Sequence, residues 1–177
     1  MGYQDYKKGN YGSAAGAGQN RHWGAKFTPK KPVRSFRDLE VYQKTLECSV
    51  LIDKDIVPVL EKIFARGLAS GGKGRIEELS KNAMAIPLYI SEGHSLRFAD
   101  FALALGYIEK ALSGCNRMSV YLDHIKGTYG DKVKVDLIED LINRYTLVRG
   151  KIFRLEQSWK KFMKADGEMS NTIQRKR

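Results

Sequence analysis

The sequence predicts an all-α protein: an antiparallel up-down four-helix bundle with a disordered basic N-terminal arm and a short basic C-terminal tail. Apolar residues recur every three or four positions over long stretches, no stretch shows the alternation typical of a strand, and glycine and polar residues are concentrated near the two ends. A chain of 177 residues, 42% of them hydrophobic, can fill one core. We therefore expect a flexible arm over 1–34, the bundle over 35–166 and a flexible tail over 167–177.

The first 34 residues combine aromatic rings with glycine, small polar residues and cations. Such a composition buries too little apolar surface to offset the loss of chain entropy on folding. Rings that stack on bases, placed among cations that meet phosphates, are typical of single-stranded nucleic-acid binding. The candidate contacts in this arm are Arg21, Trp23, Lys26, Lys30 and Lys31. An alternative is that one aromatic residue anchors the arm on the bundle or on a neighbouring subunit.

The first helix is predicted to begin at Ser35, which can cap it while Asp38 reciprocates three residues later. Its apolar spacing slips near residues 53–55, and Pro58 is expected to bend or restart it. Four glycines between residues 66 and 74 predict a loop without regular structure.

A second helix is predicted over residues 75–92, with Pro87 inside its apolar pattern and Gly93 as its C-cap. A proline there donates no backbone hydrogen bond and crowds the carbonyl of Ala83, so we expect a bend that serves packing.

Two long helices follow. The third is expected to begin after Ser95 and to run to about Ile125, with Phe98 and Phe101 on its apolar face. The fourth is expected over residues 132–165, with Asp166-Gly167 ending it.

Charge is unevenly distributed. Residues 1–37 carry eight Lys and Arg against one Asp, and residues 144–177 carry ten against three acids, whereas the centre is mildly acidic. Two basic ends around an acidic centre favour contact with a polyanion, and solvated tails are the alternative.

The fourth predicted helix supplies the second group of candidate nucleic-acid contacts. They are Arg144, Arg149, Lys151, Arg154, Lys160, Lys161 and Lys164. The spacing of Lys151, Arg154 and Lys161 predicts one stripe, for which a solvated polar face is the alternative.

No motif carries a convincing reaction. Residues 67–73 match G-x-x-x-x-G-K, but Gly74 replaces the Ser or Thr that would contact a metal, and no strand precedes the motif. The three histidines have no companions at ligand spacing, and the acid-base neighbours Glu92/His94 and Asp123/His124 show no third orienting group. We expect no enzyme activity, no metal and no cofactor.

Cys48 and Cys115 both fall on apolar helical faces, which predicts reduced core residues in a cytoplasmic protein. No apolar run approaches the roughly 20 residues that span a bilayer, so we expect no membrane partner.

Two segments resemble a known family. Residues 35–44 read S-F-R-D-L-E-V-Y-Q-K, and residues 86–93 read I-P-L-Y-I-S-E-G. Together with Arg97 they are similar to the motifs of the four-helix-bundle family encoded by intervening sequences of bacterial 23S ribosomal RNA genes. The resemblance covers roughly residues 35–162. The chain departs from the family pattern at Leu88-Tyr89 and Ser91, and its N-terminal extension and glycine-rich loop are additions.

The family is related to the accessory variability protein of diversity-generating retroelements. That relationship implies a basic, barrel-like homopentamer that binds nucleic acid and a reverse transcriptase. We therefore expect a non-catalytic, homo-oligomeric accessory protein that binds RNA or DNA and supports a reverse transcriptase or a ribonucleoprotein. The alternative is a protein-protein scaffold of this family without a nucleic-acid role of its own.

Overall fold

The computed structural model describes residues 33–66 and 72–174, and within these residues every regular element is a helix. Arg21, Trp23, Lys26, Lys30 and Lys31 of the predicted arm lie outside the described residues. In chain order the elements are η1 (Phe36–Asp38), α1 (Glu40–Leu51), η2 (Ile52–Ile56), α2 (Val57–Ala65), α3 (Gly72–Leu96), α4 (Phe101–Tyr129) and α5 (Val135–Gln174).

The first helical rod, which comprises η1, α1, η2 and α2, begins as the sequence predicts. The Ser35 hydroxyl accepts a hydrogen bond from the Arg37 N–H at 3.2 Å, and the Asp38 carboxylate accepts one from the Ser35 N–H at 2.9 Å. The predicted slip in apolar spacing corresponds to η2, a π-helical stretch between α1 and α2. A π turn adds a residue per turn and so returns the apolar side chains to the core face. Pro58 lies in the first turn of α2, directly after η2, so the residue that donates no backbone hydrogen bond follows the widened π turn of the helical segment.

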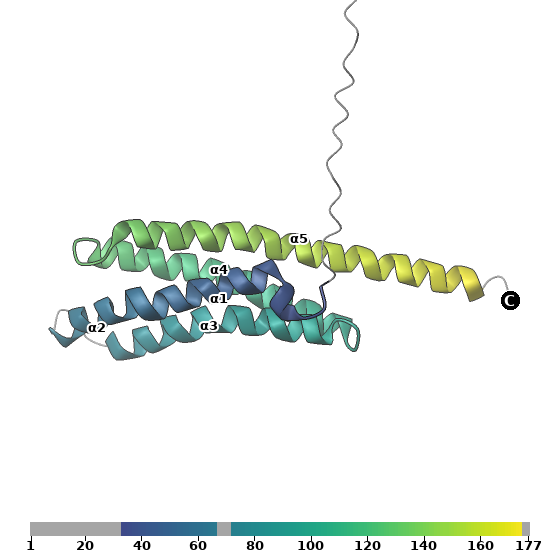
Figure 1. The fold of residues 1–177 in the computed structure, drawn as a ribbon, viewed down its shortest axis with the longest axis horizontal. Helices are drawn as coiled ribbons and strands as arrows, with labels where there is room; N and C mark the ends of the chain where they lie inside the picture. The colour runs from purple at the N-terminus through teal and green to yellow at the C-terminus, as the bar shows by residue number, and fades with distance from the viewer. Residues whose placement is uncertain (1–32, 67–71, 175–177) are drawn as a thin grey trace, which may run out of the picture. The chain divides into compact units, whose positions relative to one another are not determined.

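The helices pack as a bundle. In Figure 1, α3 lies beside α4, α4 beside α5, and α1 contacts both α3 and α5. α2 continues the line of α1 against α3. The C-terminal part of α5 runs past the turn that joins α3 to α4, so this segment leaves the bundle (Figure 1).

The core is aliphatic and draws on every helix. Ile52, Ile86, Ile108, Leu122 and Ile152 are fully buried, and burying a side chain of this size contributes about 1.5–3 kcal/mol. Cys48 and Cys115 are buried free thiols, as predicted. Burial raises the pKa of Cys48 to about 11 and that of Cys115 to about 12, so neither is a nucleophile at neutral pH.

The segment around Pro87 holds α3 against α4. Pro87 is buried, and α3 continues through it to Leu96. The prediction of Gly93 as a C-cap was wrong: Gly93 is buried inside α3, where a Cβ would lie only 3.0 Å from the Ala104 carbonyl oxygen of α4. Gly114 of α4 similarly leaves room for Ile86. Both glycines are therefore required for close helix approach rather than for a turn.

Other predicted boundaries also moved. α3 begins at Gly72, inside the predicted loop, and α4 begins only at Phe101, because the Asp100 carboxylate caps it by accepting from the Leu103 N–H at 2.9 Å. Phe98 consequently lies in the turn, 76% exposed, rather than on an apolar helical face. α5 passes through Asp166-Gly167 to Gln174, since a single glycine inside a long helix costs only about 1 kcal/mol.

Candidate nucleic-acid interface

Three of the predicted cations on α5 are engaged within the bundle. The Arg144 guanidinium donates from Nε to Asp140 at 2.7 Å and from Nη1 to Glu47 of α1 at 3.1 Å. Lys151 donates to Glu40, also on α1, and Lys160 donates to the buried Glu156 one turn before it. The hydrogen bond from Lys151 lowers the pKa of Glu40. Arg144 and Lys151 therefore connect α5 to α1 as well as carrying charge, whereas the Lys160 pair lies within α5, and spacing alone reveals neither kind of contact.

The other four predicted cations are exposed and form no ion pair among the described side chains. They are Arg149, Arg154, Lys161 and Lys164. Arg154 and Lys161 are seven residues apart, or two turns, and share one face of α5. Lys151, the third member of the predicted stripe, is instead held by Glu40.

An aromatic groove lies where the α3–α4 turn meets α5. Its lining consists of Arg97, Phe98, Phe101, Ser158, Trp159, Phe162 and Met163, around a volume of about 210 Å³. Phe98 and Phe162 are 76% and 59% exposed, respectively. Large apolar side chains so exposed and so close together mark a binding surface more often than isolated ones do.

Arg97 organises this groove. Its guanidinium carbon lies 4.3 Å from the centroid of the Phe98 ring, a cation-π distance. Its Nη1 also donates to the His94 carbonyl and lies 3.0 Å from His94 Nδ1. The turn therefore holds a cation and an exposed ring face to face.

The groove adjoins a hollow lined by lysines. Gln157, Lys160, Lys161 and Lys164 line this second hollow, and Phe101 and Met163 line both. The fold thus places cationic side chains next to exposed aromatic rings, the two kinds of group that single-strand binding combines. The sequence pattern placed Phe98 on the apolar face of a helix. The signal that could have placed Phe98 correctly is Asp100, a helix N-cap that leaves Phe98 outside α4.

The motifs considered for catalysis in the sequence are not assembled into a site among the described residues. His94 is 5% exposed and faces Trp159, with a ring-centroid separation of 6.5 Å, while Glu92 is exposed. Residues 67–71 of the glycine-rich motif lie outside the described residues, and Lys73 is in the first turn of α3. In residues 33–66 and 72–174, no three His, Cys, Asp or Glu side chains gather as metal ligands would. The helices of this part are also too short or too polar to cross a membrane.

No family model, curated protein or solved structure matches this chain.

Proposed function

We propose that this protein is a non-catalytic, cytoplasmic accessory protein that binds single-stranded RNA or DNA, built on an antiparallel up-down four-helix bundle. The observation that carries the proposal is the contact between the aromatic groove and the lysine-lined hollow at the exit of α5 from the bundle. Exposed rings at Phe98 and Phe162 stack on unpaired bases, and Lys161 and Lys164 meet the phosphates on either side.

The geometry favours single strands over a duplex. Bases inside a duplex are stacked on one another and offer no free face to Phe98, whereas an unpaired base does. The predicted arm contacts at Arg21 and Trp23 belong to the same mode of binding, because they too pair a ring with a cation.

The up-down arrangement is supported by the short connections of the chain. Residues 97–100 join α3 to α4, and residues 130–134 join α4 to α5. Connections of this length favour antiparallel neighbours.

Self-association is the second part of the proposal. Leu103 and Val120 of α4 and Leu147 of α5 are large apolar side chains that are 46%, 67% and 69% exposed. Covering such side chains in a homo-oligomer removes apolar area from water. The family resemblance supports a pentamer and adds a reverse transcriptase or a ribonucleoprotein as the partner. The same side chains favour the second candidate function, a protein-protein scaffold that leaves nucleic acid to its partner.

The test is binding of labelled single-stranded RNA and DNA, and of a matched duplex, as a function of salt. The full chain is compared with a chain that lacks residues 1–32, which are the first of its two units. We expect tighter binding of single strands, with a steep salt slope that shrinks on truncation but does not vanish. Absence of binding at about 50 mM salt would exclude the proposal and favour the scaffold.

A further inference from the structure

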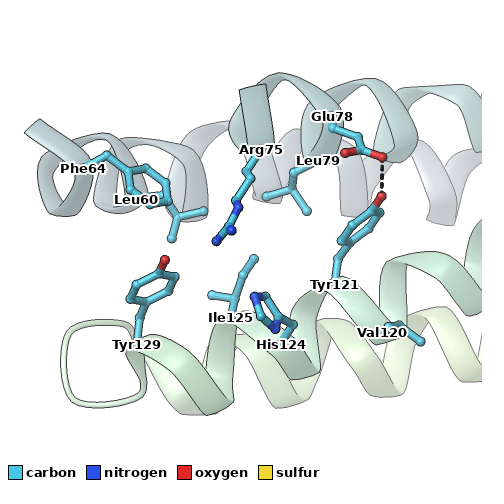
Figure 2. Close-up of a pocket in the computed structure, with 10 residues that line it drawn as sticks. All are labelled: Leu60, Phe64, Arg75, Glu78, Leu79, Val120, Tyr121, His124, Ile125 and Tyr129. Atoms are coloured by element: carbon cyan, nitrogen blue, oxygen red, sulfur yellow. Dashed lines mark hydrogen bonds between the residues drawn. The ribbon is translucent and has the colours of Figure 1, made fainter. Parts of the chain in front are cut away.

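A second concave site lies at the opposite end of α3 from the aromatic groove. Figure 2 shows it between α2 and α3 on one side and α4 on the other. Its volume is about 380 Å³, within the range of about 300–1,000 Å³ that small-molecule sites occupy. The floor is formed by the apolar side chains of Leu60, Leu79 and Ile125 and by the ring of Tyr129. All four residues are buried.

Polar groups converge on this apolar floor from two helices. In Figure 2 the Arg75 guanidinium of α3 extends into the space above Ile125 and His124 of α4, and the Tyr129 hydroxyl faces the same space. The Arg75 guanidinium, the His124 imidazole and the Tyr129 hydroxyl can each donate a hydrogen bond.

The charge of Arg75 has no counterpart in the described part of the chain. Glu78, about one turn along α3 from Arg75 and also part of the cavity lining, accepts a hydrogen bond of 2.5 Å from the Tyr121 hydroxyl of α4. No described carboxylate forms an ion pair with Arg75. The cavity therefore combines an apolar interior with a cation that has no ion-pair partner, while the carboxylate of Glu78, which also lines the cavity, is hydrogen-bonded to Tyr121.

We propose that this cavity binds a small organic acid with an apolar or aromatic body, its acid group held by Arg75 and its body resting on the floor residues. Charge complementarity selects the acid, since a planar guanidinium donates two parallel hydrogen bonds to a carboxylate, sulfonate or phosphate. The apolar lining selects the body, because covering the accessible parts of Phe64 and Val120 removes apolar surface from water and stabilises the complex in proportion to the area covered. This site is independent of nucleic-acid binding on α5.

Two fluorescent probes test the two halves of the proposal separately. Anilinonaphthalene sulfonate carries an acid group on an apolar aromatic body, and phenylnaphthylamine is the same body without the acid. We expect the full chain to bind one equivalent of the sulfonate saturably. Arg75→Gln should weaken the sulfonate by about tenfold or more, the loss expected for a charged hydrogen bond, and leave the neutral probe unchanged.

Ile125→Phe fills the cavity floor and should weaken both probes. Arg34→Gln removes an exposed arginine that precedes η1 and lines neither cavity, and it should change neither probe. Near-ultraviolet circular dichroism and the melting temperature of each variant verify that it is folded, because partly unfolded chains also bind such probes. Equal sulfonate affinity in the full chain and in Arg75→Gln would overturn the proposal. So would undiminished binding of both probes by a folded Ile125→Phe chain, or the absence of saturable binding.

Discussion

Gly93 of α3 packs directly against the backbone of α4 at Ala104, because a Cβ on Gly93 would lie 3.0 Å from the Ala104 carbonyl oxygen and 3.2 Å from the side chain of Ile108. A backbone oxygen inside a helix cannot move alone, so adding a methyl group forces α3 and α4 apart. We expect Gly93→Ala to lower the free energy of unfolding by about 1–3 kcal/mol, despite the better helix propensity of alanine.

Gly150→Ala is the matched control for that substitution. Gly150 lies inside α5, and a Cβ there meets nothing within 4 Å. Only the higher helix propensity of alanine relative to glycine matters at this position, so alanine should raise the free energy of unfolding by about 0.5–1 kcal/mol. Urea denaturation of both variants measures the difference. Equal stabilisation at the two positions would show that α3 and α4 are not in close contact at Gly93.

The hydroxyl of Tyr145 is buried without a hydrogen-bond partner among the described residues. Leaving such a group unsatisfied costs about 1–3 kcal/mol, whereas the ring itself fills the core. Tyr145→Phe should therefore leave stability unchanged or raise it by about 1 kcal/mol, and Tyr145→Ala should cost about 3–5 kcal/mol. Thermal unfolding of the two variants checks both values. A marked loss in Tyr145→Phe would indicate that a water or a partner satisfies the hydroxyl.

His94 should make stability depend on pH. Burial, and secondarily the charge of Arg97, lower the pKa of His94 in the folded chain, and Asp38 opposes them weakly. The unfolded chain, with a histidine pKa of about 6.5, therefore takes up the proton first. The contribution of a neutral His94 is complete above about pH 6.5 and is lost as the pH falls through the lowered folded-state value.

We expect the free energy of unfolding to fall as the pH drops below about 6.5, with a smaller slope in His94→Gln. Denaturation at a series of pH values measures both slopes. His124→Gln serves as the control, because the ring of His124 is exposed at the far end of α4. A native slope that survives in His94→Gln but vanishes in His124→Gln would assign the dependence to the wrong histidine.

Local signals in the sequence predicted several elements well. The Ser35–Asp38 capping box could be predicted because its hydrogen bonds join residues within one turn. The slip in apolar spacing near residue 53 could be predicted because it depends on the geometry of a single helix. The prediction for Gly93 was wrong because local signals carry no information about a neighbouring helix. A glycine that ends a helix and one that admits a neighbouring helix look alike until the position of Ala104 is known.

The candidate interface was only partly accessible to sequence analysis. The clustering of cations on α5 follows from composition. Whether a given cation is paired depends on another helix, because Glu40 and Glu47 of α1 bind Lys151 and Arg144, roughly a hundred residues away in the chain. The groove at Phe98 depends on how far α5 extends past the α3–α4 turn, which no local pattern encodes.

The two components of the proposed interface should separate in salt titrations of single-stranded RNA binding. Each phosphate contact on a single strand contributes about 0.7 to the slope of log affinity against log salt, so the pair Lys161→Gln and Lys164→Gln should reduce that slope by about 1.4. Phe98→Ala removes a stacking platform and should cost about 1–3 kcal/mol of binding at every salt concentration with the slope unchanged.

Lys54→Gln and Lys62→Gln together provide the charge-matched control. Both lysines are exposed on the first helical rod, away from the groove, and the pair removes the same net charge as the α5 pair. If the two pairs reduced affinity and slope equally, binding would depend on net charge alone, without a defined interface. A smaller loss for the Lys54 and Lys62 pair, together with a salt-independent loss for Phe98→Ala, is the result that a built single-strand site requires, because only such a site couples phosphate contacts to a stacked base.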